Sequence, residues 1–399
     1  MNYTRRIYDS ILAEHLSAHR QMAFLSGPRQ VGKTATARRV GAFYLDWDNR
    51  NHQDLILQGP EAVARHCGLQ IAAREPVVIV FDELHKFSRW KNFLKGLFDT
   101  YEARCRIVVT GSARLDVYRR GGDSLMGRYF PYRLHPFTTA ELARSTSGPE
   151  PISPPQPISN DAWDALWRHG GFPEPFLKRS PRFSHRWRTL RDERLFKEEL
   201  RDLTRVHEFG LLQTLARLLA TRSGGQLIYA NLAGEIQVSP HTAQAWVGVL
   251  ASTYYGFLVR PWFRNVSRAL RKEPKWYVRD WSGVGDPGAK AETFAAGHLL
   301  KAVEYWTDAG WGDFELYYLR DKQKREVDFL VTKNDRPWFL VEIKQRETSL
   351  SPALAHFQQQ TGAAHAFQAV LELPYAEVDC YAETVPVVVP ARTLFSQWV

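Results

Sequence analysis

The sequence predicts an α/β protein in which helices cover a parallel sheet in the first part and strands return in a second α/β region at the end. The first observation is that short apolar runs, bounded by Gly, Asp or Ser, alternate with helical patterns up to residue 143: Met22–Ser26, Ala42–Leu45, Val77–Phe81 and Arg106–Thr110. Strands that read as continuous apolar runs are buried on both faces, as in a parallel sheet between helices. The second observation is that strand patterns dominate from residue 316 onward, in Leu316–Leu319, Val327–Val331, Trp338–Ile343 and Val378–Tyr381.

Length and composition predict a soluble protein with more than one domain. At 399 residues the chain is too long for one ordinary core, and its hydrophobic and charged fractions, 44% and 24%, are typical of globular proteins. No apolar run is long enough to span a bilayer, and the N-terminus lacks the apolar core of a signal peptide, so we expect a cytoplasmic protein without a membrane partner. The three cysteines are scattered without a CxxC pair, which argues against a disulfide framework or a zinc site.

The chain is basic, with 53 Lys and Arg against 43 Asp and Glu and a formal net charge of +10. Such an excess favours a polyanionic partner such as nucleic acid. A generally basic, soluble surface explains the same numbers, so the charge alone does not choose between these two interpretations.

Composition shifts divide the chain into five predicted segments. Residues 1–143 form the first α/β region, and residues 144–160, which hold five prolines, read as a linker or a long exposed loop. Residues 161–222 are mostly helical in pattern. Residues 223–285 contain the helix-turn-helix pattern described below, and residues 286–399 form the second α/β region.

A phosphate-binding loop follows the first apolar run. The segment fits the pattern G-x-x-x-x-G-K-[ST] completely, lies between an expected strand and an expected helix, and consists of Gly27, Pro28, Arg29, Gln30, Val31, Gly32, Lys33 and Thr34. The glycines let backbone N–H groups surround phosphate oxygens, and the helix N-terminus adds its positive dipole. We expect Lys33 to reach the β- and γ-phosphates and the Thr34 hydroxyl to bind Mg²⁺.

Two carboxylates, Asp82 and Glu83, follow the third apolar run. In this arrangement Asp82 supports Mg²⁺ through its water shell, and Glu83 polarises the attacking water. The alternative is that Glu83 only caps the following helix. Thr110 and Ser112, at the end of the next strand, are candidates for sensing the γ-phosphate. Because the sequence has no guanine-selecting N-K-x-D element, the predicted nucleotide is ATP, bound with Mg²⁺.

The order of these motifs resembles the AAA+ division of P-loop ATPases. Further segments resemble a widespread prokaryotic group within it that has an uncharacterised C-terminal region: Gly127–Phe130, Leu134–Phe137, Glu141–Leu142 and Gly170–Pro173. The resemblance covers nearly the whole chain and implies ATP hydrolysis. Arg128 is then a candidate for acting on a neighbour's nucleotide, which requires an oligomer of identical chains; Arg114 is a lesser candidate. The alternative is that Arg128 holds the sheet edge to the helical region.

A helix-turn-helix pattern spans residues 226–263. Leu227–Tyr229 reads as a short strand, Ala230–Gln237 as a short helix, and Ser239–Pro240 as the N-cap and first-turn proline of a helix through Ala251. With its following strand the unit resembles a winged helix, which reads DNA with the start of its second helix. The expected DNA contacts are His241, Thr242 and Gln244 on that helix and, as phosphate contacts nearby, Arg264, Arg268, Arg271, Lys272 and Lys275. The alternative is a winged helix used for packing or for protein contact.

The last region resembles the PD-(D/E)xK nuclease core. Asp328 lies in one expected strand, and Glu342 and Lys344 lie in the next, where alternation puts both on one face. Asp328 and Glu342 are then candidate ligands of Mg²⁺, Lys344 stabilises charge, and Glu292 matches the additional acidic residue of that fold. The alternative is a solvated ion pair in an inactive domain. A basic cluster nearby suits a phosphate backbone in either case: Arg320, Lys322, Lys324 and Arg325.

The combined prediction is an ATPase that acts on DNA, in genome maintenance or defence. Two alternatives stay open. One is a regulatory switch in which ATP sets the oligomeric state and the C-terminal parts hold a protein partner. The other is an ATP-regulated, metal-dependent DNA nuclease.

Overall fold

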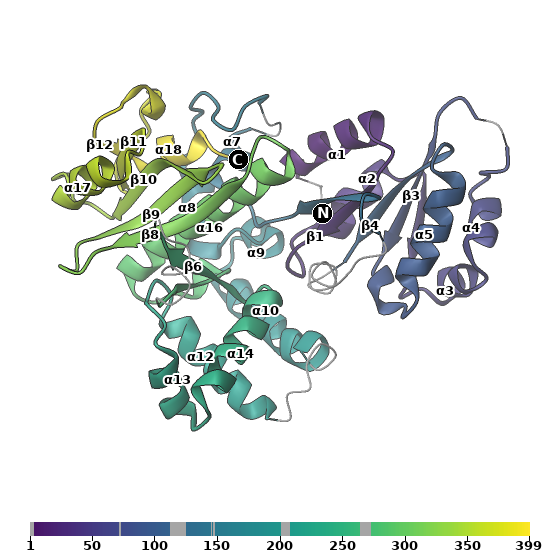
Figure 1. The fold of residues 1–399 in the computed structure, drawn as a ribbon, viewed down its shortest axis with the longest axis horizontal. Helices are drawn as coiled ribbons and strands as arrows, with labels where there is room; N and C mark the ends of the chain where they lie inside the picture. Colours follow the sequence, from purple (N-terminus) through teal and green to yellow (C-terminus); the bar gives the residue numbers. More distant parts are fainter. Residues whose placement is uncertain are drawn as a thin grey trace. The chain divides into compact units, whose positions relative to one another are not determined.

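The computed structural model of the chain describes residues 4–71, 73–111, 125–144, 146, 148–200, 208–263 and 273–399. The chain divides into two compact units, Met1–His135 and Pro136–Val399. Each unit contains its own sheet (Figure 1). The limits that composition suggests at residues 160, 222 and 285 all fall within the second unit.

The sheet of the first unit has five parallel strands, as continuous apolar runs predict. The strand order is β2-β3-β4-β1-β5, and every neighbouring pair is parallel. The strands are β1 (Met22–Ser26), β2 (Phe43–Asp46), β3 (Val77–Asp82), β4 (Cys105–Thr110) and β5 (Tyr129–Arg133). The first four match the predicted runs to within one residue. The pattern does not predict β5, because its sequence Tyr-Phe-Pro-Tyr-Arg is not an apolar run.

Helices surround this sheet and share its core. They are α1 (Ile7–Ala18), α2 (Lys33–Val40), α3 (Arg50–Leu57), α4 (Pro60–His66), the 3-10 turn η1 (Leu84–Lys86) and α5 (Trp90–Tyr101). Phe81 of β3 meets Phe93 of α5 edge to face, with ring centres 5.6 Å apart, and both side chains are buried. This packing fixes the end of β3, where Asp82 is the last residue of the strand and Glu83 follows it.

The second unit begins with helices and ends with an α/β region. Its helical elements are α7 (Thr139–Ala143), α8 (Asn160–His169), α9 (Pro173–Lys178), α10 (Pro181–Arg194), the π-helical segment η3 (Leu195–Leu200), α12 (Phe209–Thr221), α13 (Tyr229–Ile236), α14 (Pro240–Ser252), η4 (Trp281–Gly283), α16 (Pro287–Asp308), α17 (Pro352–Thr361), η5 (Cys380–Ala382) and α18 (Ala391–Ser396). In Figure 1 the helices α12, α13 and α14 lie together, and their buried residues form one apolar cluster.

The second unit also holds a mixed sheet of seven strands in the order β12-β11-β10-β9-β8-β6-β7. The strands are β6 (Gly256–Pro261), β7 (Lys275–Val278), β8 (Phe314–Arg320), β9 (Glu326–Lys333), β10 (Arg336–Lys344), β11 (His365–Val370) and β12 (Val387–Pro390). β6 is antiparallel to β7 and joins β8 in parallel through two residue pairs, Arg260 with Tyr317 and Pro261 with Tyr318. The strands that follow α14 therefore share a sheet with the C-terminal region.

Three of the four strands predicted from residue 316 onward are confirmed, and the fourth is wrong. β8, β9 and β10 contain the predicted runs. Residues 378–381 are not a strand, because the side chain of Asp379 accepts the N–H of Tyr381 at 3.0 Å and starts the 3-10 turn η5. Such local side-chain hydrogen bonds compete with strand ladders. β11 pairs with β10 instead, and β12 pairs with β11 at the edge of the sheet.

The helix-turn-helix pattern is confirmed in its second helix and wrong in its first strand. The hydroxyl of Ser239 accepts the N–H of Thr242 at 3.0 Å, and Pro240 lies in the first turn of α14, as predicted. Tyr229 already belongs to α13, and the N–H of Leu227 donates to the carbonyl of Pro274 at 2.8 Å without forming a strand.

Before α8 begins, the described residues of the proline-rich segment form neither helix nor strand, as predicted, and part of the segment packs against the end of the chain. The N–H of Ser153 donates to the carbonyl of Gln397 at 2.9 Å, and the N–H of Gln156 donates to the hydroxyl of Ser396 at 3.1 Å. Ser153 and Ile158 are buried. Because backbone groups need partners when they are buried, these contacts explain how a proline-rich stretch is accommodated in the packed unit.

The helices of the described part of the chain are too short or too polar to cross a bilayer.

Candidate functional site

The phosphate-binding loop joins β1 to α2 at the carboxyl edge of the first sheet. Three loop residues have a left-handed backbone: Gly27 at φ 142°, Gln30 at φ 62° and Gly32 at φ 105°. Glycine adopts such angles without steric cost. At Gly27 the available space also forbids a side chain, since a Cβ atom there would meet the carbonyl oxygen of Leu134 at 2.3 Å. The first glycine of the motif therefore allows the loop to pass directly over the segment after β5.

We expect Gly27→Ala to destabilise the first unit and weaken nucleotide binding, because the added methyl group forces the loop away from Leu134. The control is Gly68→Ala, at φ 69° with no heavy atom within 4 Å of a Cβ, which adds backbone strain without a clash. Overpacking costs about 1–3 kcal/mol. The free energy of unfolding in urea is expected to fall by that much more in Gly27→Ala than in the control. Equal losses in the two variants would contradict the role given to the clash.

Two cationic side chains bind the loop. Lys33, 7% exposed, donates from Nζ to the carbonyl oxygens of Gly27 and Pro28 at 2.9 and 2.8 Å. Arg6, 2% exposed, donates from Nη1 to the carbonyl of Val31 at 2.7 Å. Sequence reasoning missed Arg6, because no motif links it to a loop that lies much later in the chain. Both groups place positive charge beside the backbone that would surround a phosphate.

Asp82 accepts hydrogen bonds from three hydroxyl groups at the carboxyl edge of the sheet. Thr34 donates to Oδ2 at 2.8 Å, Tyr44 donates to the same oxygen, and Thr110 donates to Oδ1. The structure thus brings together Asp82, Thr34 and Thr110 as the sequence predicts. Hydroxyl and carboxylate oxygens are ligands that Mg²⁺ prefers, so Thr34 and Asp82 are the side chains that fit a magnesium ion beside bound phosphates.

Tyr44, at the end of β2, is a member of this site that sequence reasoning missed. Burial first, and then the hydrogen bond to Asp82, raise the pKa of Tyr44 above its ordinary range. The phenol therefore stays protonated at neutral pH and acts as a donor. The guanidinium of Arg38 lies 4.2 Å from the centre of the Tyr44 ring, which holds the ring in place. The only signal in the sequence is a tyrosine in the strand beside the Asp82 strand.

Glu83 has a left-handed backbone, with φ 54°. A non-glycine residue in this conformation stores strain of about 1–3 kcal/mol, and such residues cluster at functional sites. Its carboxylate lies 3.3 Å from Nζ of Lys86 and 3.7 Å from Nε2 of His85, and Lys86 also contacts Asp48 at 2.6 Å. Glu83 makes no side-chain capping bond to η1, which disfavours the capping interpretation. The ammonium of Lys86 instead neutralises the carboxylate.

Arg128 lies away from the phosphate-binding loop of its own chain. It directly precedes β5, whose first residue pairs with Met22, so Arg128 stands at the amino edge of the sheet. Its guanidinium donates to both carboxylate oxygens of Asp99 in α5, at 2.7 and 3.0 Å. That hydrogen bonding lowers the pKa of Asp99. The contact joins the sheet edge to α5 of the same unit. The catalytic role in a neighbouring chain and the alternative contact with the helical region both stay predictions. Ser112 and Arg114 lie outside the described residues.

The predicted DNA contacts are described only in part. His241 and Gln244 are exposed at the start of α14, and Thr242 is half-buried beside them. Arg264, Arg268, Arg271 and Lys272 lie outside the described residues. Lys275 corrects the prediction of a phosphate contact, because it is 3% exposed and its ammonium points at carboxylates.

The acidic residues predicted in the C-terminal region lie near one another, around Lys275. The ammonium of Lys275 lies 2.7 Å from Glu292, 2.5 Å from Glu326 and 3.9 Å from Asp328. Burial alone lowers the pKa of Lys275, but the three carboxylates outweigh burial and raise it. Sequence reasoning missed Glu326 as part of this cluster, because the PD-(D/E)xK pattern includes only one carboxylate, Asp328, in that strand.

Other donors also contact three carboxylates of the cluster. Asp328 accepts the backbone N–H of Ile343 at 2.8 Å, Glu342 contacts Nζ of Lys344 at 2.9 Å, and Glu292 accepts from the hydroxyl of Tyr277 at 2.5 Å. Burial, followed by the charges of Glu292 and Glu342, raises the pKa of Asp328 well above its usual range. Within the described residues no group of three or more His, Cys, Asp or Glu side chains is arranged to hold a metal ion. Asp328 and Glu342 as they lie do not fit the predicted Mg²⁺.

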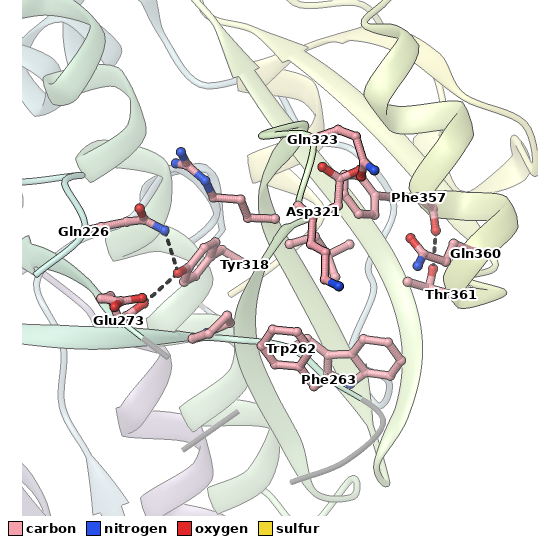
Figure 2. Close-up of a pocket in the computed structure, with 14 residues that line it drawn as sticks. Gln226, Trp262, Phe263, Glu273, Tyr318, Asp321, Gln323, Phe357, Gln360 and Thr361 are labelled. Atoms are coloured by element: carbon pink, nitrogen blue, oxygen red, sulfur yellow. Dashed lines mark hydrogen bonds between the residues drawn. The ribbon is translucent and has the colours of Figure 1, made fainter. Parts of the chain in front are cut away.

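A cleft of about 610 Å³ opens in the second unit between the end of β6, the β8–β9 turn and α17. Figure 2 shows Trp262 and Phe263 side by side along it, with Phe357 and Gln360 of α17 across from Gln226 and Tyr318. Gln226 donates to the hydroxyl of Tyr318 at 2.9 Å, and that hydroxyl donates to the carbonyl of Glu273 at 2.6 Å. The lining therefore combines aromatic rings with side-chain amides, and Arg320 and Lys322 also line it.

Comparisons with known proteins divide the chain into three matched regions. Residues 19–143 match a family model described as an AAA domain, and residues 160–284 and 287–392 match two domains of unknown function, DUF8612 and DUF4143. Two uncharacterized proteins, Mb2031c of Mycobacterium bovis and Rv2008c of Mycobacterium tuberculosis, are each 26% identical over 344 residues, 82% of this chain and 71% of theirs.

A solved structure, a Signal Transduction ATPase with Numerous Domains (STAND) protein with a tetratricopeptide repeat sensor from Pyrococcus horikoshii, superposes with a TM-score of 0.23 at 13% identity. The match covers 77% of this chain, which spans about half of that protein, 48%. Residues 19–143 thus match an AAA domain, and the five-stranded parallel sheet that they contain is consistent with a P-loop NTPase fold.

Proposed function

We propose that this protein hydrolyses ATP at the phosphate-binding loop and uses the nucleotide cycle to act on DNA. The observation that carries the ATPase part is the meeting of Lys33, Thr34 and Asp82 at one edge of a parallel sheet, within the region that matches an AAA domain. Ligands of open α/β sheets bind outside the carboxyl ends of the strands.

In the proposed reaction the loop and the first turn of α2 hold the phosphates of ATP with backbone N–H groups. Lys33 adds a positive charge that neutralises the β- and γ-phosphate oxygens. Thr34 and Asp82 would hold Mg²⁺, which would supply further positive charge beside the phosphates. Glu83 orients the attacking water and accepts its proton, once the contact with Lys86 opens. Arg128 of a neighbouring chain would complete the site in a homo-oligomer.

The DNA part of the proposal is supported by charge and by the lining of the cleft. The chain carries a formal net charge of +10, and the start of α14 presents His241 and Gln244 to solvent. The cleft offers Trp262 and Phe263 beside amide side chains, and Arg320 and Lys322 also line it. Unpaired bases stack on such rings and hydrogen-bond to such amides, while cations track the phosphates. These features favour a single strand over an intact duplex as the DNA form that is bound.

The proposal is tested by steady-state ATP turnover without DNA and then with single-stranded, duplex and branched DNA, with Lys33→Ala as the blank. We expect single-stranded DNA to give the strongest stimulation. If another DNA form gives the strongest stimulation, the proposal of a DNA-linked ATPase holds, but the proposed preference for single-stranded DNA is wrong. A rate that no DNA form changes contradicts the DNA part and favours a switch controlled by a protein partner.

Trp262→Ala is expected to weaken binding of a fluorescent oligothymidylate. Stacking of one base contributes about 1–3 kcal/mol, which corresponds to a roughly 5- to 150-fold higher Kd at fixed salt. Fluorescence anisotropy measures the change. The matched control is Trp311→Ala, a half-buried tryptophan that does not line the cleft. An unchanged Kd in Trp262→Ala, or equal changes in the two variants, would contradict the assignment of the cleft.

A further inference from the structure

The C-terminal acidic cluster comprises Glu292 of α16, Glu326 and Asp328 of β9, and Glu342 of β10, with the ammonium of Lys275 among them. We propose that Lys275 takes the place of a divalent cation in this cluster, so that its ammonium holds the carboxylates together and the region does not cleave nucleic acid.

The first argument is the need for a cation. Asp328 and Glu342 lie with Glu292 and Glu326 in a region where side chains are mostly hidden from water, with exposed side-chain fractions between 9 and 25%. Burying carboxylates without an opposite charge is strongly unfavourable. A metal ion is one solution, and a buried lysine is another. Lys275, whose side chain is 4% exposed, supplies the second solution directly.

The second argument is geometric. The ammonium contacts carboxylates on two different elements, Glu292 of α16 at 2.7 Å and Glu326 of β9 at 2.5 Å, and it lies 3.9 Å from Asp328. A divalent ion bound by these carboxylates would face the same oxygens. Lys275 lies on β7, and β6 lies between β7 and β8 in the sheet. The strand order therefore determines the position of the ammonium.

The third argument is the use of ligand oxygens. Mg²⁺ requires nearly octahedral coordination by oxygens with free lone pairs. One oxygen of Glu292 accepts from both Lys275 and Tyr277, and one oxygen of Asp328 accepts the N–H of Ile343. Oε2 of Glu342 is buried without a hydrogen-bond partner. Protein donors therefore already occupy oxygens of Glu292 and Asp328 that an ion would need, whereas Oε2 of Glu342 is a ready ligand if the ammonium is removed.

The experiment replaces the ammonium and asks whether a metal ion restores what is lost. Lys275→Met is expected to lower Tm by roughly 10 °C, because it removes the ammonium that lies among the partly buried carboxylates of Glu292, Glu326 and Asp328. Mn²⁺ is expected to recover most of that loss by binding the carboxylates that have lost the ammonium. Asp82→Asn is present in every variant, so that the phosphate-binding loop contributes no Mn²⁺ carboxylate ligand and the result is independent of the ATPase proposal.

The matched control is Lys301→Met. Lys301 is also fully buried and pairs with the carboxylate of Glu141, outside the acidic cluster. Its loss also lowers Tm, and one carboxylate does not bind Mn²⁺ strongly, so Mn²⁺ is expected not to restore it. Restoration of both variants to the same extent, or of neither, would overturn the proposal.

A second measurement uses the chain with Lys275 intact, and therefore does not depend on the folding of a variant. Calorimetric titration with Mn²⁺ is expected to give the same heat whether or not Asp328→Asn is present, and neither protein is expected to cut single-stranded or duplex DNA. Mn²⁺ binding that Asp328→Asn removes, or DNA cleavage that it abolishes, would show a working metal centre and overturn the proposal.

Discussion

Lys33→Ala is expected to lower ATP turnover by at least roughly 10²- to 10³-fold, the effect of removing one preorganised charged donor from a developing negative charge. Lys33 already lies on the loop, with its ammonium 2.9 and 2.8 Å from two loop carbonyl oxygens. The substitution removes the only lysine of the motif and also the two hydrogen bonds that tie α2 to the loop. Nucleotide affinity is therefore expected to fall together with the turnover rate.

The control for this variant is Lys95→Ala, which removes an exposed lysine from α5 of the same unit. It tests whether a general loss of positive charge lowers turnover. Turnover is measured by phosphate release, and affinity by the fluorescence of a labelled ATP analogue. Wild-type turnover in Lys33→Ala would mean that the hydrolysis occurs elsewhere, and equal losses in both variants would mean that the effect is not specific to the loop.

Glu83→Gln is expected to bind ATP within a few-fold of wild-type affinity and to lose turnover by roughly 10²- to 10⁴-fold, the range of general-base contributions. Glutamine has the size of glutamate and keeps a hydrogen-bonding oxygen, but it does not accept the proton of the attacking water. The carboxylate also meets Lys86 at 3.3 Å. Loss of this ion pair changes stability little, since both side chains are partly exposed.

Single-turnover hydrolysis and analogue binding, measured side by side, separate the chemical step from nucleotide affinity. Glu61→Gln serves as the control, because Glu61 is an exposed glutamate in α4, with a side-chain exposure of 75%. If Glu83→Gln hydrolyses ATP at the wild-type rate, Glu83 is not the base. If it fails to bind ATP, Glu83 shapes the site and its role in hydrolysis is left without support.

The proposed nucleotide site was accessible to sequence reasoning because its main residues are contiguous or follow apolar runs directly. Gly27 to Thr34 form one motif, and Asp82 ends a run that can only be a buried strand. Parallel strands bring their carboxyl ends to one edge, so the meeting of Asp82 with Thr34 follows from the strand pattern. The hydrogen bond between them, at 2.8 Å, agrees with that expectation.

The residues that sequence reasoning missed are those that tertiary structure alone brings to a site. Tyr44 reaches Asp82 because β2 is the neighbour of β3, an order that the sequence does not state. Lys275 was expected at a phosphate, because a lysine after a run of basic residues is normally exposed. Its strand instead enters the sheet beside β6, where the carboxylates of β9 and α16 surround its ammonium.

The parallel contact between β6 and β8 has a consequence for how the second unit assembles. The register has Arg260 and Pro261 beside Tyr317 and Tyr318, residues that are far apart along the chain. Closing so long a loop costs entropy before the short ladder contributes any stability. The β6–β7 hairpin is therefore expected to join the sheet late in folding and to be the first part to detach in partial unfolding. Because Trp262 and Lys275 flank this junction, the cleft and the acidic cluster would form in the same late step.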